Sequence, residues 1–200
     1  MARPSTQKQR RIEVIDAALE AAAEHGLRGL SLTDVANHAG VTRGALLYYY
    51  EDLDAILVEA HAAGMRRVGE ERAALVARQQ GAAARLATAI DAGLPSGPDD
   101  ALMRLLYEFD VLAGKSPLHD ELVQRLYREQ LSLYRGILEE GVESGDFSLT
   151  GPLDDVAMNL VALEDAYGLH ICAGGSITVA DARRAIALYA TQAGAPIEQA

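Results

Sequence analysis

The 200-residue sequence contains a single cysteine, Cys172, no tryptophan and only two phenylalanines. One cysteine excludes an intramolecular disulfide and any metal centre built from several thiolates. The longest stretch without a charged residue covers the fifteen residues 166–180, which is shorter than the roughly 20 residues that cross a bilayer as a helix. Residues 1–11 hold no apolar core of the kind that a secretion signal needs. We therefore expect a soluble, cytoplasmic protein with no membrane partner.

Basic residues are also scarce, and they are unevenly distributed. The net charge of the chain is −11. Residues 1–50 carry six Lys and Arg against five Asp and Glu, whereas residues 51–200 carry twelve against twenty-four. Nucleic-acid-binding domains are often basic, so the overall charge argues against such a role. The asymmetry indicates a small N-terminal module with one task and an acidic remainder with another.

The composition predicts an all-α fold. Apolar residues make up 50% of the chain and charged residues 24%, which excludes wholesale disorder. Strong helix formers dominate, and no segment alternates apolar and polar residues as a strand would. We expect about nine helices, arranged as an N-terminal three-helix domain and a larger helical domain. The segments delimited by turn and capping signals are residues 7–24, 31–39, 42–50, 53–80, 101–112, 117–144, 154–172 and 178–192.

Residues 31–50 have the pattern of a helix-turn-helix. Ser31 and Thr42 are expected N-caps of two short helices, because a hydroxyl can accept from an otherwise unpaired helical amide. Gly40 supplies the unusual backbone angles of the turn. Val35 and Leu46 are expected to pack the two helices together. An ordinary helical hairpin is the alternative, since an Ala-Gly-Val turn occurs there too.

From Arg11 to about Leu57, the chain resembles the TetR family of bacterial one-component transcriptional regulators. The resemblance includes the helix end His25-Gly26 and the run SLTDVANHAGVTRGALLYYY over residues 31–50. It implies a helix-turn-helix DNA-binding domain in residues 1–52. It also implies a ligand-binding and dimerisation domain in residues 53–200.

The chain departs from the family pattern where family members contact phosphates. Leu47 and Tyr49 stand where a tyrosine and a histidine are common, and Tyr50 replaces a core phenylalanine. Leu53, between acidic residues, replaces a lysine at the start of the fourth helix. Phosphate contacts must therefore come from hydroxyls, the N-terminal arm and Arg43, the one cation of the expected recognition helix. The resulting DNA-binding candidates are Lys8, Arg10, Arg11, Ser31, Thr42, Arg43, Gly44, Tyr48 and Tyr49.

The acidic remainder offers candidates for an effector pocket and for a dimer interface. A mostly apolar pocket with a few polar anchors is typical of small-molecule sites. The candidate ligand-binding residues are Met103, Tyr107, Asp110, Tyr127, Tyr134, Asp165 and His170. The helix over residues 154–172 is apolar on two sides, so one side can face its own core and the other a partner. The candidate dimerisation residues are Leu160, Leu163, Tyr167, Ile171, Ala182, Ile186 and Tyr189. A large monomeric core is the alternative.

The functional prediction is a homodimeric, sequence-specific regulator that binds double-stranded DNA at a palindromic operator. We expect a repressor that a small-molecule effector releases. The alternatives are an activator of the same fold, and a helical dimer that binds a small molecule but has lost DNA binding. The sequence has no phosphate-binding glycine loop, no zinc-ligand spacing and no cue for an activated nucleophile. We therefore expect neither enzymatic activity nor a metal site nor a cofactor.

Overall fold

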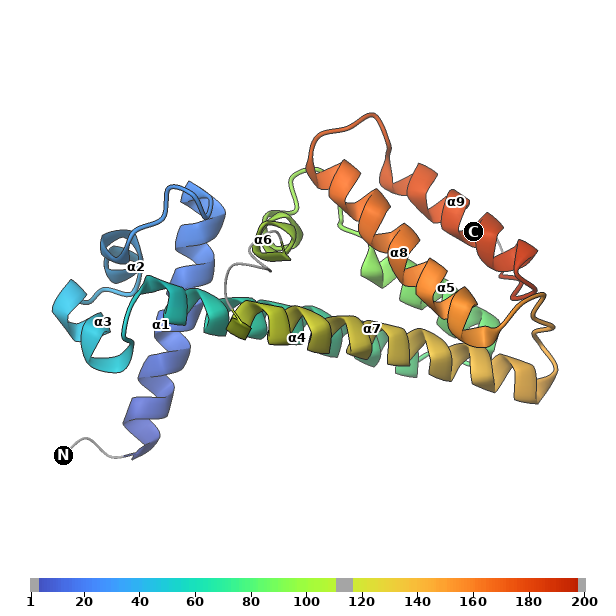
Figure 1. The fold of residues 1–200 in the computed structure, drawn as a ribbon, viewed down its shortest axis with the longest axis horizontal. Coiled ribbons are helices and arrows are strands. Elements are labelled where there is room, and N and C mark those ends of the chain that lie inside the picture. The colour runs from blue at the N-terminus through green and yellow to red at the C-terminus, as the bar shows by residue number, and fades with distance from the viewer. Residues whose placement is uncertain (1–3, 111–116, 198–200) are drawn as a thin grey trace. The chain divides into compact units, whose positions relative to one another are not determined.

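The structure, a computed structural model, describes residues 4–110 and 117–197, and all the regular elements in these two ranges are helices. Their order along the chain is shown in Figure 1. Their bounds are α1 Pro4–His25, α2 Leu32–His38, α3 Arg43–Tyr49, α4 Leu53–Ala77, α5 Ala82–Gly93, α6 Ala101–Asp110, α7 Pro117–Ser144, α8 Leu153–Cys172 and α9 Val179–Gln192. The predicted all-α fold is confirmed. The end predicted for α6, at residues 111–114, lies outside the described residues.

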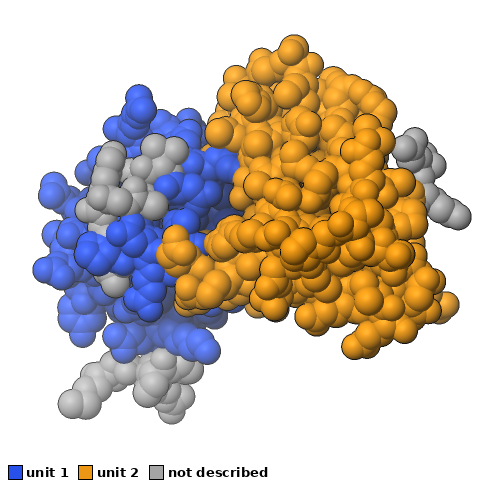
Figure 2. Space-filling model, turned by 45° about the vertical axis from the view of Figure 1, so that its right-hand side comes forward, with its two compact units in different colours: residues 1–67, 105–123 blue, residues 68–104, 124–200 orange. Residues whose placement is uncertain are grey.

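The helices form two compact units (Figure 2). Unit 1 comprises residues 1–67 and 105–123, and unit 2 comprises residues 68–104 and 124–200. Helices α4, α6 and α7 each contribute residues to both units. Unit 1 thus includes the first part of α4, which lies beyond the predicted domain boundary at residue 52.

Local signals start and stop the helices of the N-terminal region. Ser31 and Asp34 form a reciprocal capping box, in which the Ser31 side chain accepts from the Asp34 amide and Asp34 accepts from the Ser31 amide. Thr42 caps α3 by accepting from the Ala45 amide at 3.2 Å. Gly26 and Gly40 have φ angles of +69° and +62°, which L side chains rarely adopt. These turns explain why the two short helices were correctly predicted.

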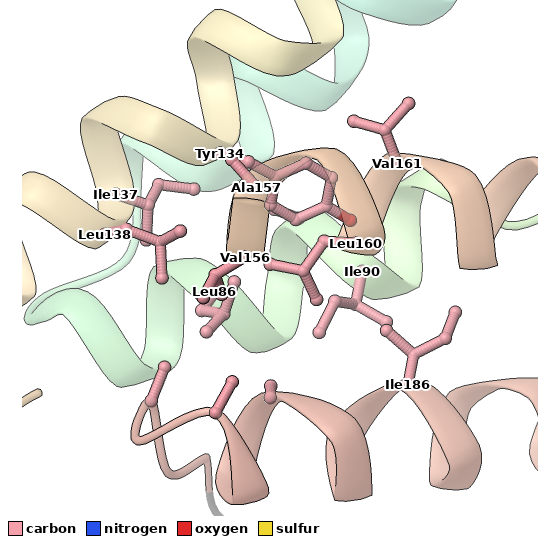
Figure 3. Packing of buried hydrophobic residues seen from close by; sticks show 14 of the residues in the cluster. Leu86, Ile90, Tyr134, Ile137, Leu138, Val156, Ala157, Leu160, Val161 and Ile186 are labelled. Atoms are coloured by element: carbon pink, nitrogen blue, oxygen red, sulfur yellow. The ribbon is translucent and has the colours of Figure 1, made fainter. Parts of the chain in front are cut away.

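The core of unit 2 is built by α5, α7, α8 and α9. It contains fully buried aliphatic side chains from all four helices, with Tyr134 among them (Figure 3). Figure 1 shows α8 and α9 running side by side in this unit. Thr178 and Asp181 form a second capping box at the start of α9. Among the described helices, none is both long and apolar enough to cross a membrane.

Candidate nucleic-acid interface

Helices α2 and α3 form the predicted helix-turn-helix. Val35 and Leu46 are fully buried, and Ala36 is 3% exposed where the helices approach each other. The Val41 amide donates to the Ala36 carbonyl at 2.9 Å and closes the turn. Burial on one side leaves the opposite side of α3 to the solvent.

The exposed side of α3 and its N-cap carry four of the nine predicted DNA-contacting residues. Thr42, Arg43 and Gly44 are exposed at its N-terminal end, and Tyr48 is 80% exposed further along. Tyr49 is partly buried, and its ring packs edge-on against Tyr48 at a centroid distance of 5.1 Å. A Cβ at Gly44 would meet no atom closer than 4.0 Å, so packing within the chain does not require a glycine there.

Arg11, predicted to be a DNA-contacting arm residue, has partners within the chain. Its guanidinium makes an ion pair with Glu59 and lies 4.7 Å above the ring of Tyr50. Tyr50 is 5% exposed, and its hydroxyl donates to Glu59 at 3.0 Å. Burial, together with the Glu59 carboxylate, raises the pKa of Tyr50 to about 12. Arg11 therefore links α1 to α4 through Glu59, which also accepts from the Tyr50 hydroxyl.

The other predicted DNA-contacting residues of α1 and of the start of α2 differ in exposure and in their partners within the chain. Lys8 is exposed, whereas Arg10 makes an ion pair with Glu13 at 2.6 Å. The Ser31 hydroxyl is engaged with Asp34 Oδ2 at 2.6 Å. At the start of α4, Asp52 accepts from the Ala55 amide at 2.8 Å. The acid at this helix start thus occupies an amide that could otherwise bind a phosphate.

A buried polar network lies in unit 2 and includes one predicted ligand-binding residue. Arg72 makes two hydrogen bonds to the Glu164 carboxylate, at 2.8 and 2.7 Å, and Tyr134 donates to the same carboxylate at 2.5 Å. Burial and the charge of Glu164 raise the pKa of the Tyr134 hydroxyl well above its usual value. Arg72 was not predicted, since nothing in its local sequence marks it as buried.

The predicted ligand-binding residues are divided between the two units. Tyr107 and Asp110 belong to unit 1, and the other five belong to unit 2. His170 and Tyr127 are exposed, Met103 and Asp165 are half-buried, and Tyr134 is fully buried. An open groove of about 380 Å³ in unit 2 contains none of them. Its lining residues are Ala73, Val76, Ala77, Arg85, Ser132, Leu133, Gly136, Ile137 and Glu140.

The predicted dimerisation residues divide into two groups. The first group comprises Leu160, Ile171, Ala182 and Ile186. These side chains are buried in the core of the protomer, with at most 2% exposure. They therefore cannot face a partner. The second group, Leu163, Tyr167 and Tyr189, is half-buried at the edge of this core. The exposed apolar residues of α8 and α9 are instead Met158, Leu169 and Leu188, at 42%, 50% and 51%.

Two buried histidines in unit 1 were not predicted. His61 is 0% and His119 is 1% exposed, and their ring nitrogens have no hydrogen-bond partner among the described residues. His61 stacks on Phe109 at a centroid distance of 4.6 Å. Its Nε2 lies 3.7 Å from an oxygen of Asp110. Burial raises the pKa of Asp110 to about 6.

Comparison with known proteins agrees with this geometry. Residues 14–60 match the family described as bacterial regulatory proteins, tetR family. A fatty acid metabolism regulator protein of Bacillus subtilis is 23% identical over 176 residues, which cover 81% of this chain and 90% of that protein.

Two solved structures illustrate the shared fold. A TetR transcription regulator from Haloarcula marismortui matches with a TM-score of 0.84 at 19% identity, covering 93% of this chain and 98% of that one. A transcriptional regulator from Saccharomonospora viridis in complex with choline matches with a TM-score of 0.83 at 19% identity, covering 92% and 96%.

The fold and the exposed α3 define a helix-turn-helix protein with a second helical unit. Residues 14–60 are similar to the TetR family of bacterial regulatory proteins, and the fold is similar to that of a TetR transcription regulator. The match to the family lies in residues 14–60, which include the helix-turn-helix, and the similarity of fold extends over nearly the whole chain.

Proposed function

We propose that this protein is a homodimeric repressor that binds a palindromic operator and is released by a small-molecule effector. The observation that carries this proposal is the exposed side of α3, in a helix-turn-helix similar to that of the TetR family. The second helix of such a motif enters the major groove with its N-terminal residues against the base edges. In this chain those residues are Thr42, Arg43 and Gly44.

Arg43 is the principal base-reading or phosphate-binding group of this proposal. It is the one basic residue in α3, and a guanidinium can donate two parallel hydrogen bonds to a guanine edge or a phosphate. Tyr48 and Thr42 add exposed hydroxyls that can donate to phosphates. Gly44 has no packing role within the chain, and a glycine lets the DNA backbone come close to the helix.

The charge distribution predicts selective binding with a weak non-specific background. Residues 51–200 carry twice as many acidic as basic residues, and repulsion from phosphates lowers affinity for arbitrary DNA. Each phosphate contact contributes about −0.9 to the slope of log affinity against log salt. Few basic residues therefore imply a shallow salt dependence.

Dimerisation through α8 and α9 is the second part of the proposal. Met158 and Leu169 are exposed on α8, and Leu188 is exposed on α9. Exposed apolar side chains on two adjacent helices are suited to a self-complementary two-fold contact. A two-fold axis would present two α3 helices to half-sites about 34 Å apart.

Relatives support a small organic effector for unit 2. The Saccharomonospora viridis structure contains choline, and the Bacillus subtilis relative is described as a fatty acid metabolism regulator. The hypothesised mechanism has two states, and the effector favours the one whose α3 helices no longer match the half-sites. Coupling of this kind is typically worth about 1–3 kcal/mol.

DNA binding is tested by fluorescence anisotropy with duplexes that tile the region upstream of the protein's own gene, at low and near-physiological salt. We expect one palindromic duplex to bind tightly at both salt concentrations. Arg43→Ala should abolish this binding, whereas Arg183→Ala, which removes an exposed arginine from α9, should leave it intact. If no duplex binds, selection from a random DNA pool follows. If that selection also yields none while the dimer is intact, the alternative of a ligand-binding dimer without DNA binding replaces the proposal.

Dimerisation is tested by placing a charge on the exposed apolar surface. Leu169→Glu and Leu188→Glu should each shift the mass measured by light scattering from dimer to monomer. Val142→Glu is the matched control, because Val142 is 46% exposed on α7. A monomeric wild-type protein, or dimers that survive in both α8 and α9 variants, would contradict the proposed interface. Transcription from the operator, measured with and without the protein, distinguishes a repressor from an activator.

A further inference from the structure

Three potential metal ligands meet at the end of α1 and on α2. Glu24 and His25 are the last two residues of α1, and His38 is the last residue of α2. One ligand atom from each of the three side chains lies within 4.8 Å of the others. The rings of His25 and His38 are perpendicular, with centroids 5.9 Å apart. All three residues belong to unit 1.

The hydrogen bonds of His38 leave one ring nitrogen for a cation. Nδ1 of His38 lies 3.0 Å from the Asp34 carbonyl oxygen, which can only accept, so Nδ1 carries a proton. Nε2 lies 3.1 Å from Oε2 of Glu24, and a carboxylate also only accepts. In neutral imidazole, a lone pair would therefore face a carboxylate oxygen. Attraction between these two atoms needs a positive charge there, either a proton on Nε2 or a metal ion.

A histidine that donates one ring N–H to a backbone carbonyl is typical of metal sites, because this bond fixes the tautomer and aims the other nitrogen at the ion. The separation of the two ligand atoms also fits. Ligands about 2.0–2.1 Å from a common ion, at angles between about 90° and 110°, lie roughly 2.9–3.4 Å apart. The 3.1 Å between His38 Nε2 and Glu24 Oε2 falls within this range.

The local charge favours a cation as well. Glu20 and Glu24 are four residues apart on α1, so they lie on the same side of this helix. Carboxylates on this side attract a divalent ion.

We propose that Glu24, His25 and His38 bind a divalent first-row transition-metal ion such as Zn²⁺, Co²⁺ or Ni²⁺. Two imidazoles and one carboxylate suit these ions, whereas Mg²⁺ and Ca²⁺ prefer oxygen ligands alone. Glu24 and His25 are solvent-exposed and His38 is half-buried, so water can complete the coordination. The bound ion cross-links the end of α1 to α2 and stabilises the helix-turn-helix. This site was not predicted, because its residues lie 13 and 14 positions apart without a zinc spacing.

The test uses the full-length protein without an affinity tag, after treatment with a chelator. Titration with Co²⁺ is followed by visible absorption, and Zn²⁺ is then added as a competitor. We expect one Co²⁺ per chain and displacement by Zn²⁺. Glu24→Gln, His25→Gln and His38→Gln should each weaken binding by at least about tenfold, the lower end of the loss caused by removing even an outer-shell partner. His170→Gln, which changes an exposed histidine of unit 2, should bind as the wild type does.

Stability provides a second readout that does not depend on absorption. Zn²⁺ should raise the Tm of the wild type and of His170→Gln, and it should not raise that of Glu24→Gln, whose side chain keeps its shape. The proposal would be overturned if the wild type did not bind Co²⁺, or if all three ligand variants bound Co²⁺ as tightly as the wild type. Loss of binding in a His61→Leu variant with retention in the three ligand variants would also overturn it, by placing the ion at the buried histidines.

Discussion

Arg72 of α4 and Glu164 of α8 form an ion pair inside unit 2 that is joined by two hydrogen bonds. Their side chains are 5% and 2% exposed. Removing two charges from water is costly, and their mutual attraction offsets that cost only with good geometry and with the remaining oxygen sites satisfied. Here Tyr134 supplies a further hydrogen bond to Glu164. The network therefore specifies how α4, α7 and α8 pack more than it adds to net stability.

Breaking this ion pair from one side should be strongly destabilising. Glu164→Gln leaves the Arg72 charge buried without a counter-ion, which costs about 3–5 kcal/mol. Urea denaturation measures this loss. Asp91→Asn is the control, because it breaks an ion pair with Arg183 in which both side chains are more than 40% exposed; an exposed pair contributes at most about 1 kcal/mol. Equal losses in the two variants would contradict the interpretation.

Gly93 should tolerate no side chain, because the Glu164 carboxylate occupies the space. A Cβ on Gly93 would lie 2.3 Å from Cδ of Glu164. Gly93→Ala should lower the free energy of unfolding by about 1–3 kcal/mol, as overpacking does. Gly97→Ala is the matched control, since its Cβ would meet no atom within 4 Å. Similar stability of the two variants in urea would show that Glu164 moves aside without cost.

The buried His61 should make the protein less stable as the pH falls. Burial, followed by the charge of His119, lowers the pKa of His61 to about 4, whereas a free imidazole has a pKa of about 6.5. Between these values the unfolded chain binds a proton that the folded chain does not. The free energy of unfolding should therefore fall by up to about 3 kcal/mol from pH 6.5 to pH 4.

Asp110 acts in the opposite direction over part of this range. Its raised pKa of about 6 means that the folded chain binds a proton that the unfolded chain lacks, so stability rises as the pH falls through 6. Thermal unfolding of the wild type and of His61→Leu across pH 4–7 separates the contribution of His61 to the pH dependence of stability from that of Asp110. The variant should lose less stability on acidification than the wild type, and the exposed-site control His170→Leu should behave as the wild type does. The same pH dependence in His61→Leu would contradict the assignment.

Arg11 should contribute to stability and not to DNA affinity. Arg11→Ala removes an ion pair with Glu59 and a contact with the Tyr50 ring. Because the Arg11 side chain is 39% exposed, we expect a loss of about 1 kcal/mol. Lys8→Ala, at an exposed position of the same helix, should leave stability unchanged and reduce operator affinity. Denaturation measures the stability of both variants, and fluorescence anisotropy measures their affinity for the operator. A large loss of affinity in Arg11→Ala, but not in Lys8→Ala, would show that Arg11 contacts DNA.

The helix-turn-helix was predictable because each of its signals is local. The capping box of Ser31 and Asp34, the cap by Thr42 and the positive φ of Gly40 involve residues at most three positions apart. The capping box of Thr178 was predictable for the same reason. The dimerisation prediction was less successful, since a helix that is apolar on two sides does not reveal which side its own chain covers. Leu160 and Ile171 proved to be core residues.

The sequence by itself determined the all-α class, the helix-turn-helix and the acidic character of residues 51–200, because capping, periodicity and charge are properties of neighbouring residues. Only the tertiary structure decided which polar groups meet. Arg72 and Glu164 are 92 positions apart, and Arg11 and Glu59 are 48 apart. The Glu24, His25 and His38 cluster likewise requires α1 and α2 to pack together. Such contacts depend on the path of the whole backbone, which no local pattern encodes.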